Sequence, residues 1–460
     1  MMILAKTLSE INPALFQSIH PSKMINSATM EIREEIMFRS DNCRKWLILS
    51  MLLLLIQTAH AASILIPMDE KQTNHLKAYG IAFWTLEQGV EVKWLLNYRG
   101  GSFLIQHQQA IASECLVRGV SFETLADGQT NNLLTEISRE DVNQDAVSLQ
   151  KAPRIAVYSP PNKRPWDDAV TLVLKYAEIK FDVVYDEEIL NGKLKDYDWL
   201  HLHHEDFTGQ FGKFFQAYQF VPWYQEEVRV NKELAKKLGF MKVSEMKKVI
   251  TRDIHQFIEN GGFLFAMCAA TDTYDIAQAA QGVDICESMY DGDPADPDMN
   301  SKLDFANTLA FQNFTINRNP YEYNFSNIDV TLTRKVPREQ DYFTLFQFSA
   351  KWDPVPTMLC QNHANMIKGF MGQTTAFNRN LIKPNVLIMG ENKAANEARY
   401  IHGELGKGFW TFYGGHDPED FQHFVGNPAT DLSLYPNSPG YRLILNNVLF
   451  PAAKKKKHKT

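Results

Sequence analysis

A cysteine between a short apolar run and a helical pattern is the residue of this chain best suited to nucleophilic chemistry. Residues 263–265 predict a buried strand, and residues 275–280 belong to a helical pattern that begins soon after Cys268. A sharp strand-to-helix turn presents a nucleophile, and it needs small neighbours, which Ala266 and Ala270 supply. The dipole of the following helix favours a thiolate. A small buried cysteine at a strand end is the alternative interpretation.

A thiol nucleophile needs a base and a group that orients the base. Residues 414–420 read Gly-Gly-His-Asp-Pro-Glu-Asp and follow an aromatic run that predicts a strand. His416 is the predicted base, and Glu419 is the carboxylate predicted to orient it. The same residues are also typical of a turn that leads into an acidic first helical turn.

Histidines and carboxylates gather at the end of another predicted strand. Alternation of side chains places His201 and His203 on one face and His204 on the other. Glu205 and Asp206 follow directly. Imidazoles beside carboxylates are typical of a divalent-metal site, and they are equally typical of a polar substrate pocket.

An aromatic stretch follows this histidine cluster after a short loop. Residues 218–224 include Tyr218, Trp223 and Tyr224. Aromatic faces stack on sugars and other flat ligands, so Tyr224 is a candidate substrate-binding residue. A packed aromatic cluster is the alternative.

A short acidic stretch is the candidate calcium site. Residues 291–298 contain four aspartates in eight positions. Carboxylate oxygens suit Ca²⁺, so Asp291, Asp293 and Asp296 are the predicted ligands, although the glycine position does not match an EF-hand. A solvated turn is the alternative interpretation.

Apolar runs alternate with helical patterns in two parts of the chain. Residues 62–126 predict a small α/β domain, the polar residues 127–153 predict a linker, and residues 154–453 predict a larger α/β domain with an irregular insertion near 284–320. Fully apolar strands predict a mainly parallel sheet with helices on both faces.

Ligands of such sheets bind beyond the carboxyl ends of the strands. His203, His204 and Cys268 all follow predicted strands, so we expect them to open onto one cleft. We expect the small first domain or the insertion to cover that cleft in part.

The N-terminal region is typical of an exported protein. Arg44 and Lys45 precede an apolar run that ends at Ile56, and residues 59–61, Ala-His-Ala, form a cleavage signal. The run is too short to span a bilayer. Residues 1–61 are therefore predicted to be an N-terminal extension and a signal peptide that begins near Met37, and the mature chain is expected to be secreted or periplasmic.

Composition limits the partners of the mature chain. A net charge of −7 gives no reason to expect nucleic acid, and the basic tail at residues 454–460 is short. Beyond the signal region, no segment is apolar enough to predict a membrane span. An even number of mature cysteines permits disulfides, but their spacing shows no framework. They are Cys115, Cys268, Cys286 and Cys360.

An elbow cysteine followed much later by a histidine and a glutamate resembles the class I glutamine amidotransferase-like superfamily. The resemblance covers the chain from about Arg154 onward and implies a flavodoxin-like sheet and hydrolysis of an amide. Active members carry Gly-x-Cys-x-Gly and His-x-Glu, whereas this chain has Ala-Met-Cys-Ala-Ala around Cys268 and His-x-x-Glu from His416. Relatives that have lost the triad serve as sugar-related or accessory domains.

The chain also resembles secreted Bacteroidetes proteins that carry the label asparagine synthetase B. The matching stretches are 65–69, 75–80, 97–101 and 203–206. That label implies ATP-dependent transfer of ammonia to aspartate. The chain has no Ser-Gly-Gly pyrophosphate loop, and cleavage near Ala62 exposes no N-terminal cysteine, so the sequence argues against synthetase chemistry.

Two functions of different classes follow from these patterns. One is a secreted cysteine-dependent amide hydrolase or amidotransferase that acts on a small molecule. The other is a non-catalytic secreted protein that binds a carbohydrate or peptide ligand. Calcium or another divalent metal is the only cofactor that the sequence suggests.

Overall fold

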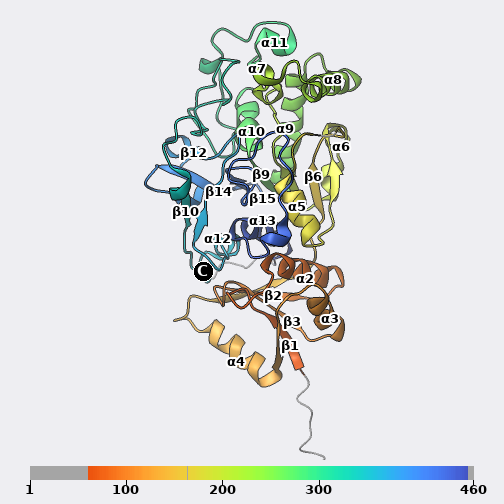
Figure 1. Cartoon of the computed structure of the whole chain (residues 1–460), viewed down its shortest axis with the longest axis vertical. Helices are drawn as coiled ribbons and strands as arrows, with labels where there is room; N and C mark the ends of the chain where they lie inside the picture. The colour runs from red at the N-terminus through yellow and green to blue at the C-terminus, as the bar shows by residue number, and fades with distance from the viewer. Residues whose placement is uncertain (1–60, 163, 454–460) are drawn as a thin grey trace, which may run out of the picture. The chain divides into compact units, whose positions relative to one another are not determined.

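Two β-sheets organise the described part of the chain, which the computed structural model gives as residues 61–162 and 164–453 (Figure 1). The predicted extension and signal peptide, residues 1–61, lie outside the described residues except for Ala61, which begins the first strand, and the predicted basic tail at 454–460 lies outside them entirely. Among the described helices, none has the length and apolar character needed to cross a membrane.

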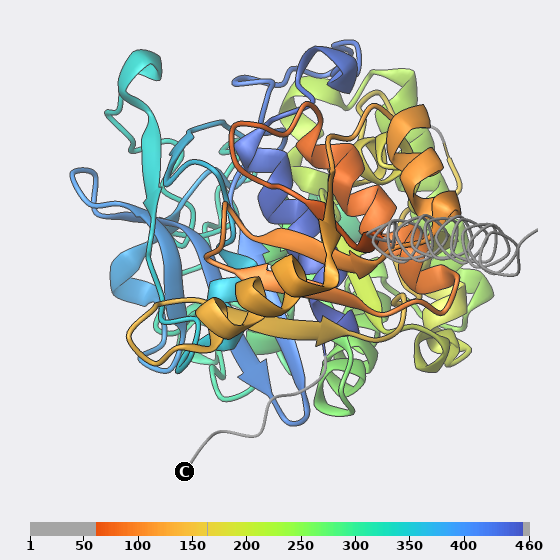
Figure 2. The same cartoon turned by 90° about the horizontal axis from the view of Figure 1, so that it is seen from below.

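The N-terminal sheet is antiparallel, with strand order β4-β1-β3-β2-β5. Helix α2 packs on one face, where Tyr79 meets Trp94 and Phe103. Helix α4 crosses the other face (Figure 2). The elements are β1 (Ala61–Ile66), α2 (His75–Glu87), β2 (Val92–Leu96), β3 (Ser102–Gln106), α3 (Gln109–Val117), β4 (Glu123–Ala126), α4 (Asp127–Ser138) and β5 (Asp145–Leu149).

The residues predicted as a linker, 127–153, contain helix α4 and strand β5. Strand β5 pairs along β2, and Leu133 and Ile137 of α4 pack against leucines of the sheet. The stretch is polar because only one side of α4 is buried. Its composition therefore resembles that of a linker, although it forms a helix and a strand. The N-terminal sheet therefore continues to Leu149.

The larger sheet is mixed, with order β11-β10-β13-β14-β15-β9-β8-β6-β7, and β12 pairs with β14. The strands β7-β6-β8-β9-β15 are parallel neighbours, and the strands from β14 to β11 are antiparallel. In chain order the parallel strands lie 2-1-3-4-5, which is the flavodoxin-like order. The parallel strands are β6 (Ile155–Tyr158), β7 (Asp182–Val184), β8 (Trp199–Leu202), β9 (Phe263–Met267) and β15 (Gly408–Tyr413), and the antiparallel ones are β10 (Tyr342–Leu345), β11 (Met366–Lys368), β12 (Phe377–Asn378), β13 (Leu387–Asn392) and β14 (Glu397–Leu405).

Helices cover both faces of the parallel strands, as the apolar runs predict. Alternate residues face opposite sides: Val157 and Phe265 join a core with α5 and α13, whereas Leu200 and Leu264 join a second core with α9 and α10. Burial on both faces explains why these strands carry almost no polar residue. The helices are α5 (Ala169–Tyr176), α6 (Asp186–Leu190), α7 (Phe215–Tyr218), α8 (Pro222–Lys237), α9 (Val243–Glu259), α10 (Ala269–Ala279), α12 (Pro354–Leu359) and α13 (Pro439–Leu449).

A long irregular segment separates α10 from β10, in the region predicted as an insertion. It contains the short helix α11 (Ser288–Asp291) and little other regular structure. The buried carboxylate of Asp275 on α10 holds the segment by accepting three backbone N–H groups. These belong to Leu309, Ala310 and Phe311, at 2.7, 2.8 and 2.8 Å.

Candidate active site

Cys268 lies between β9 and α10, where the sequence predicts the elbow. Its φ of 51° and ψ of −139° are outside the regions that non-glycine residues favour. Backbone strain of this kind concentrates at functional sites, because the surrounding packing must hold it in place. The turn puts Sγ at the carboxyl end of β9, where it accepts a hydrogen bond from the Gln373 N–H at 3.3 Å. The predicted strand-cysteine-helix turn is confirmed.

Burial governs the protonation of this thiol. It raises the pKa of Cys268 to about 11, although the backbone N–H groups of Gln373, Thr374 and Ala269 act in the opposite direction. A thiol with this pKa carries its proton at neutral pH, so a nucleophilic role requires a base nearby.

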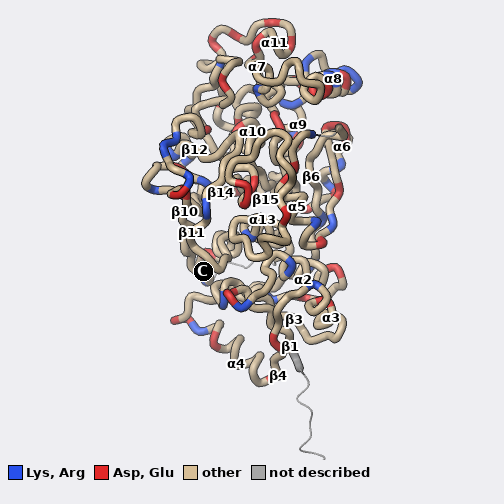
Figure 3. The backbone as a smooth tube through the Cα atoms, in the orientation of Figure 1, with Lys and Arg blue, Asp and Glu red and all other residues tan. Residues whose placement is uncertain are grey.

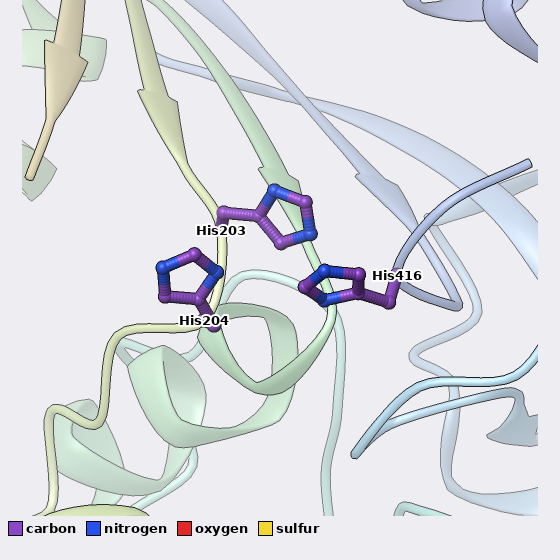
Figure 4. Close-up of side chains that lie close together, drawn as sticks. All are labelled: His203, His204 and His416. Atoms are coloured by element: carbon purple, nitrogen blue, oxygen red, sulfur yellow. The ribbon is translucent and has the colours of Figure 1, made fainter. Parts of the chain in front are cut away.

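Three histidines converge beside the elbow (Figure 4). His203 and His204 follow the end of β8, and His416 follows the end of β15. The ring centroids lie 4.9 Å apart for His203 and His204, 4.5 Å for His203 and His416, and 5.8 Å for His204 and His416. One ring nitrogen from each lies within 4.8 Å of the other two. The carboxyl ends of parallel strands thus bring together imidazoles that are far apart in the sequence.

These imidazoles are short of hydrogen-bond partners. Burial and neighbouring imidazoles lower the pKa of His204 and of His416 well below the ordinary value of 6.5. Four of their buried ring nitrogens have no hydrogen-bond partner within the described residues. They are Nδ1 and Nε2 of His203, Nδ1 of His204 and Nε2 of His416.

A cavity of about 270 Å³ joins the thiol to the histidines. Cys268, His204 and His416 all line it, and Gln373 closes it beside the sulfur. Aromatic side chains make up much of the remaining wall: Trp166, Phe214, Tyr323 and Phe424. Such a cavity suits a small ligand that has one polar end and one flat or apolar part.

The cover of this cavity differs from the prediction. None of the described lining residues belongs to the first domain or to residues 284–320. Tyr323, just beyond that insertion, contributes one wall, and residues 371–373 and 422–425 contribute others. The N-terminal sheet packs instead against α13, where Arg442 donates hydrogen bonds to the carbonyl oxygens of Met68 at 3.0 Å and Gly100 at 2.7 Å.

Glu419 points to a different environment from His416. Its carboxyl group interacts with Ser438 and Lys368, and burial raises its pKa. The described residues include no hydrogen bond or ion pair between Glu419 and His416. The acid beside His416 is Asp167, one of whose oxygens lies within 4.8 Å of ring nitrogens of His416 and His423.

The residues predicted to bind substrate separate into two groups. His204 lines the cavity and His203 lies beside it. Glu205 forms an ion pair with Arg164 at 3.3 Å, and burial raises its pKa to about 7. Asp206 accepts the N–H groups of Thr208 and Gly212 and thereby shapes its own loop. The buried Tyr224 belongs to the core beneath the aromatic cluster.

The predicted calcium ligands already have a cationic partner. The Lys242 Nζ lies 3.1 Å from Asp291, 2.6 Å from Asp293 and 2.5 Å from Asp284. Asp296 pairs with Lys302 at 3.3 Å. A single ammonium group therefore bridges three carboxylates of this region, and the aspartates of the loop appear red beside α11 in Figure 3. All four described cysteines are free thiols.

The residues that contact the histidines of the site from behind were not identified from the sequence. Asp168 lies 3.3 Å from Nε2 of His201 and 3.4 Å from Nδ1 of His203. His423 stacks on His416 with centroids 4.2 Å apart and an interplanar angle of 14°. The pair Asp167-Asp168 before a helical pattern was the available signal, but it is also the ordinary signature of a helix start.

Comparison with known proteins gives distant structural similarity only. No family model and no curated protein matches the chain. The cytoplasmic protein STM3548 from Salmonella typhimurium is similar over 66% of this chain and 100% of its own, at 11% identity and a TM-score of 0.31. The exo-beta-1,4-mannosidase Op5Man5 from Opitutaceae bacterium strain TAV5 is similar over 66% of this chain and 37% of its own, at 11% identity and a TM-score of 0.27.

A third solved structure is the GH42 beta-galactosidase Gan42B from G. stearothermophilus. The similarity covers 58% of this chain and 28% of that one, at 10% identity and a TM-score of 0.25. The assignment to an α/β fold with a flavodoxin-like parallel part rests on the strand order of this chain itself.

Proposed function

We propose that the chain is a secreted or periplasmic, glutamine amidotransferase-like hydrolase or transferase that attacks an amide or related carbonyl group with Cys268. One observation carries the proposal. A buried cysteine adopts strained backbone angles at the carboxyl end of a central parallel strand, and its side chain lines a cavity that also contains imidazoles. Packing has to hold such strain, and a role in presenting the sulfur accounts for it.

The chemistry requires the thiol proton to move to an imidazole. In this proposal the Cys268 sulfur attacks the carbonyl carbon while its proton passes to His416, which is uncharged and therefore able to accept it. His416 then protonates the leaving amine, a thioester remains on Cys268, and water or a second amine releases the acyl group. The stacked His423 and the nearby Asp167 hold the imidazole, in place of Glu419.

The cavity supports a small substrate with a flat or apolar part. Its volume of about 270 Å³ is near the lower end of ordinary ligand pockets, which begin at roughly 300 Å³. Its aromatic walls also favour a second candidate, a non-catalytic protein that binds a carbohydrate or peptide group by stacking. The reactivity of the thiol distinguishes the two functions.

The test is alkylation of the purified native protein with iodoacetamide, followed by mass spectrometry of each cysteine peptide. We expect Cys268 to react faster at neutral pH than the partly exposed Cys360, and we expect His416→Ala to slow that reaction. Cys360→Ser is the matched control and should leave the rate at Cys268 unchanged. A rate at Cys268 that is no higher than at Cys360 would exclude an activated nucleophile and leave the binding function.

A further inference from the structure

We propose that His203, His204 and His416 bind one divalent transition-metal ion of the zinc class in the cavity beside Cys268. One ring nitrogen from each histidine lies within 4.8 Å of the other two. Zinc binds imidazole nitrogens at about 2.0–2.1 Å, so binding would turn the three rings toward a common point. The site goes beyond the proposed hydrolysis and does not depend on it.

The first argument is the state of the ring nitrogens. Buried polar atoms normally have a hydrogen-bond partner, and leaving one without a partner destabilises the folded protein. Within the described residues, His203 and His416 are at most 5% exposed, and Nε2 of each has no such partner. A single cation would satisfy these atoms together with the third imidazole.

The second argument is the carboxylate behind the ring of His203. Histidines that bind metal usually direct their other nitrogen to a carboxylate, which fixes the ring and strengthens the ligand. Asp168 lies 3.4 Å from Nδ1 of His203, which leaves Nε2 for the ion. Asp168 is itself fixed, because it caps α5 by accepting the Thr171 N–H at 2.8 Å. The helix that positions this carboxylate is therefore part of the site.

The third argument concerns the choice among overlapping groups. Asp168, His201 and His203 also converge, as do Asp167, His416 and His423. Nδ1 of His201 already contacts the Phe265 carbonyl oxygen at 3.1 Å inside the sheet, and its ring does not line the cavity. Two rings of the chosen group line the cavity, so a fourth position remains available to water or substrate. His416 and His423 also line it, but they stack face to face at 14°, so the lone pairs that lie in the two ring planes do not point at a common ion.

The ligand set also determines the class of ion. Three imidazole ligands favour zinc, cobalt, nickel or copper, whereas calcium and magnesium prefer oxygen ligands. Within the described residues, the sulfur of Cys268 does not belong to the converging group, so Cys268→Ser should leave the affinity unchanged. A bound ion would use the lone pair of His416 that the proposed hydrolysis needs for a proton. Metal-loaded and proton-accepting forms of the site are therefore mutually exclusive.

The experiment is titration of the purified, EDTA-treated native protein with Co²⁺ and with Zn²⁺. We expect one equivalent to bind, with the visible absorption of tetrahedral or five-coordinate Co²⁺. His204→Ala is the primary variant because this ring is partly exposed, and it should weaken binding at least about tenfold. His255→Ala, on α9 outside the cavity, is the matched control and should bind as the native protein does.

His416→Ala provides an independent second test. Circular dichroism and the melting temperature confirm that each variant is folded, and Cys268→Ser separates metal binding from thiol chemistry. Absence of binding at micromolar protein, or binding that persists unchanged in folded His204→Ala and His416→Ala, overturns the site. Because neither readout uses activity, failure of the metal site leaves the alkylation result to decide the proposed hydrolysis separately.

Discussion

Two groups of ionisable side chains in this protein differ in whether their polar atoms already have partners. The acidic loop concentrates four aspartates in eight positions, 291–298, and Lys242 and Lys302 form ion pairs with three of them. The histidine cluster is spread from His203 to His416, and it buries several ring nitrogens that have no hydrogen-bond partner among the described residues. The denser sequence motif is the one in which most carboxylates already have a cationic partner.

The difference shows what identifies a cation site. A run of carboxylates in a turn is fully explained when an ammonium group lies among them, because an ion pair satisfies the oxygens. Buried imidazole nitrogens have no such explanation, and the cost of burial grows with each one left unpaired. The contrast between the two groups therefore depends on the free-energy cost of burying a polar group in this protein. That cost can be measured at a single buried carboxyl group.

The largest effect that we predict concerns the buried Asp275. Burial raises its pKa to about 6 from the ordinary 3.8, even though it accepts three backbone N–H groups. The folded state therefore binds this proton more tightly than the unfolded state, so the contribution of Asp275 to stability is fully present below pH 3.8 and is lost as the pH rises through about 6. A shift of this size is worth roughly 3 kcal/mol.

Urea unfolding of the native protein and of Asp275→Asn at several pH values measures this contribution. The amide mimics the protonated acid, so the difference in free energy of unfolding between the two proteins should change by roughly 2 kcal/mol between pH 4 and 6. Glu404→Gln, at an exposed position, is the control and should show no such change. A flat difference for Asp275→Asn would mean that burial acts weakly here, and it would weaken the case for the histidine cluster.

The next effect sharpens the comparison at the histidines themselves. Asp168→Asn keeps a good helix cap for α5 but removes the negative charge behind His203. We expect the affinity for Co²⁺ to fall by roughly 10–100-fold with little change in melting temperature. Asp431→Asn, which changes another capping aspartate, is the control. Equal affinity in Asp168→Asn and native protein would show that this carboxylate does not support a metal ligand.

Local patterns predicted the parts of the site that follow apolar strands. Cys268 and His203 were found because parallel strands buried on both faces are readily recognised and end at one edge of the sheet. Glu419 was assigned from spacing, and spacing does not specify side-chain direction after Pro418. Asp168 was not predicted as a site residue because an aspartate before a helical pattern is typical of a helix cap. The sequence alone does not show that the same carboxylate also contacts two histidines.

The same reasoning explains the errors in the fold. Helix α4 buries only Leu133 and Ile137, so its polar sequence resembles a linker, and its stability comes from the sheet beneath it. Strand β14, residues Glu397–Leu405, was not predicted because its polar residues have partners that lie far away in sequence. The buried Glu397, for example, pairs with Arg334 at 2.9 Å.

The smallest effect tests the acidic loop directly. Lys242→Met removes the ammonium group that contacts Asp284, Asp291 and Asp293, so the carboxylates would repel one another. Because these pairs are partly exposed, we expect the melting temperature to fall by only about 2 °C.

Calcium supplies the decisive comparison. Added Ca²⁺ should raise the melting temperature of Lys242→Met, since the ion replaces the missing ammonium group and binds only the folded loop. The native protein should show no such rise, because Lys242 already satisfies the same oxygens. Lys302→Met, which removes the partner of Asp296 alone, is the matched control and should behave as the native protein does. An equal response of the native protein to Ca²⁺ would show that the loop binds cations despite its lysine. The acidic loop and the histidine cluster would then differ only in the type of ligand atom, oxygen or nitrogen, and not in whether those atoms already have partners.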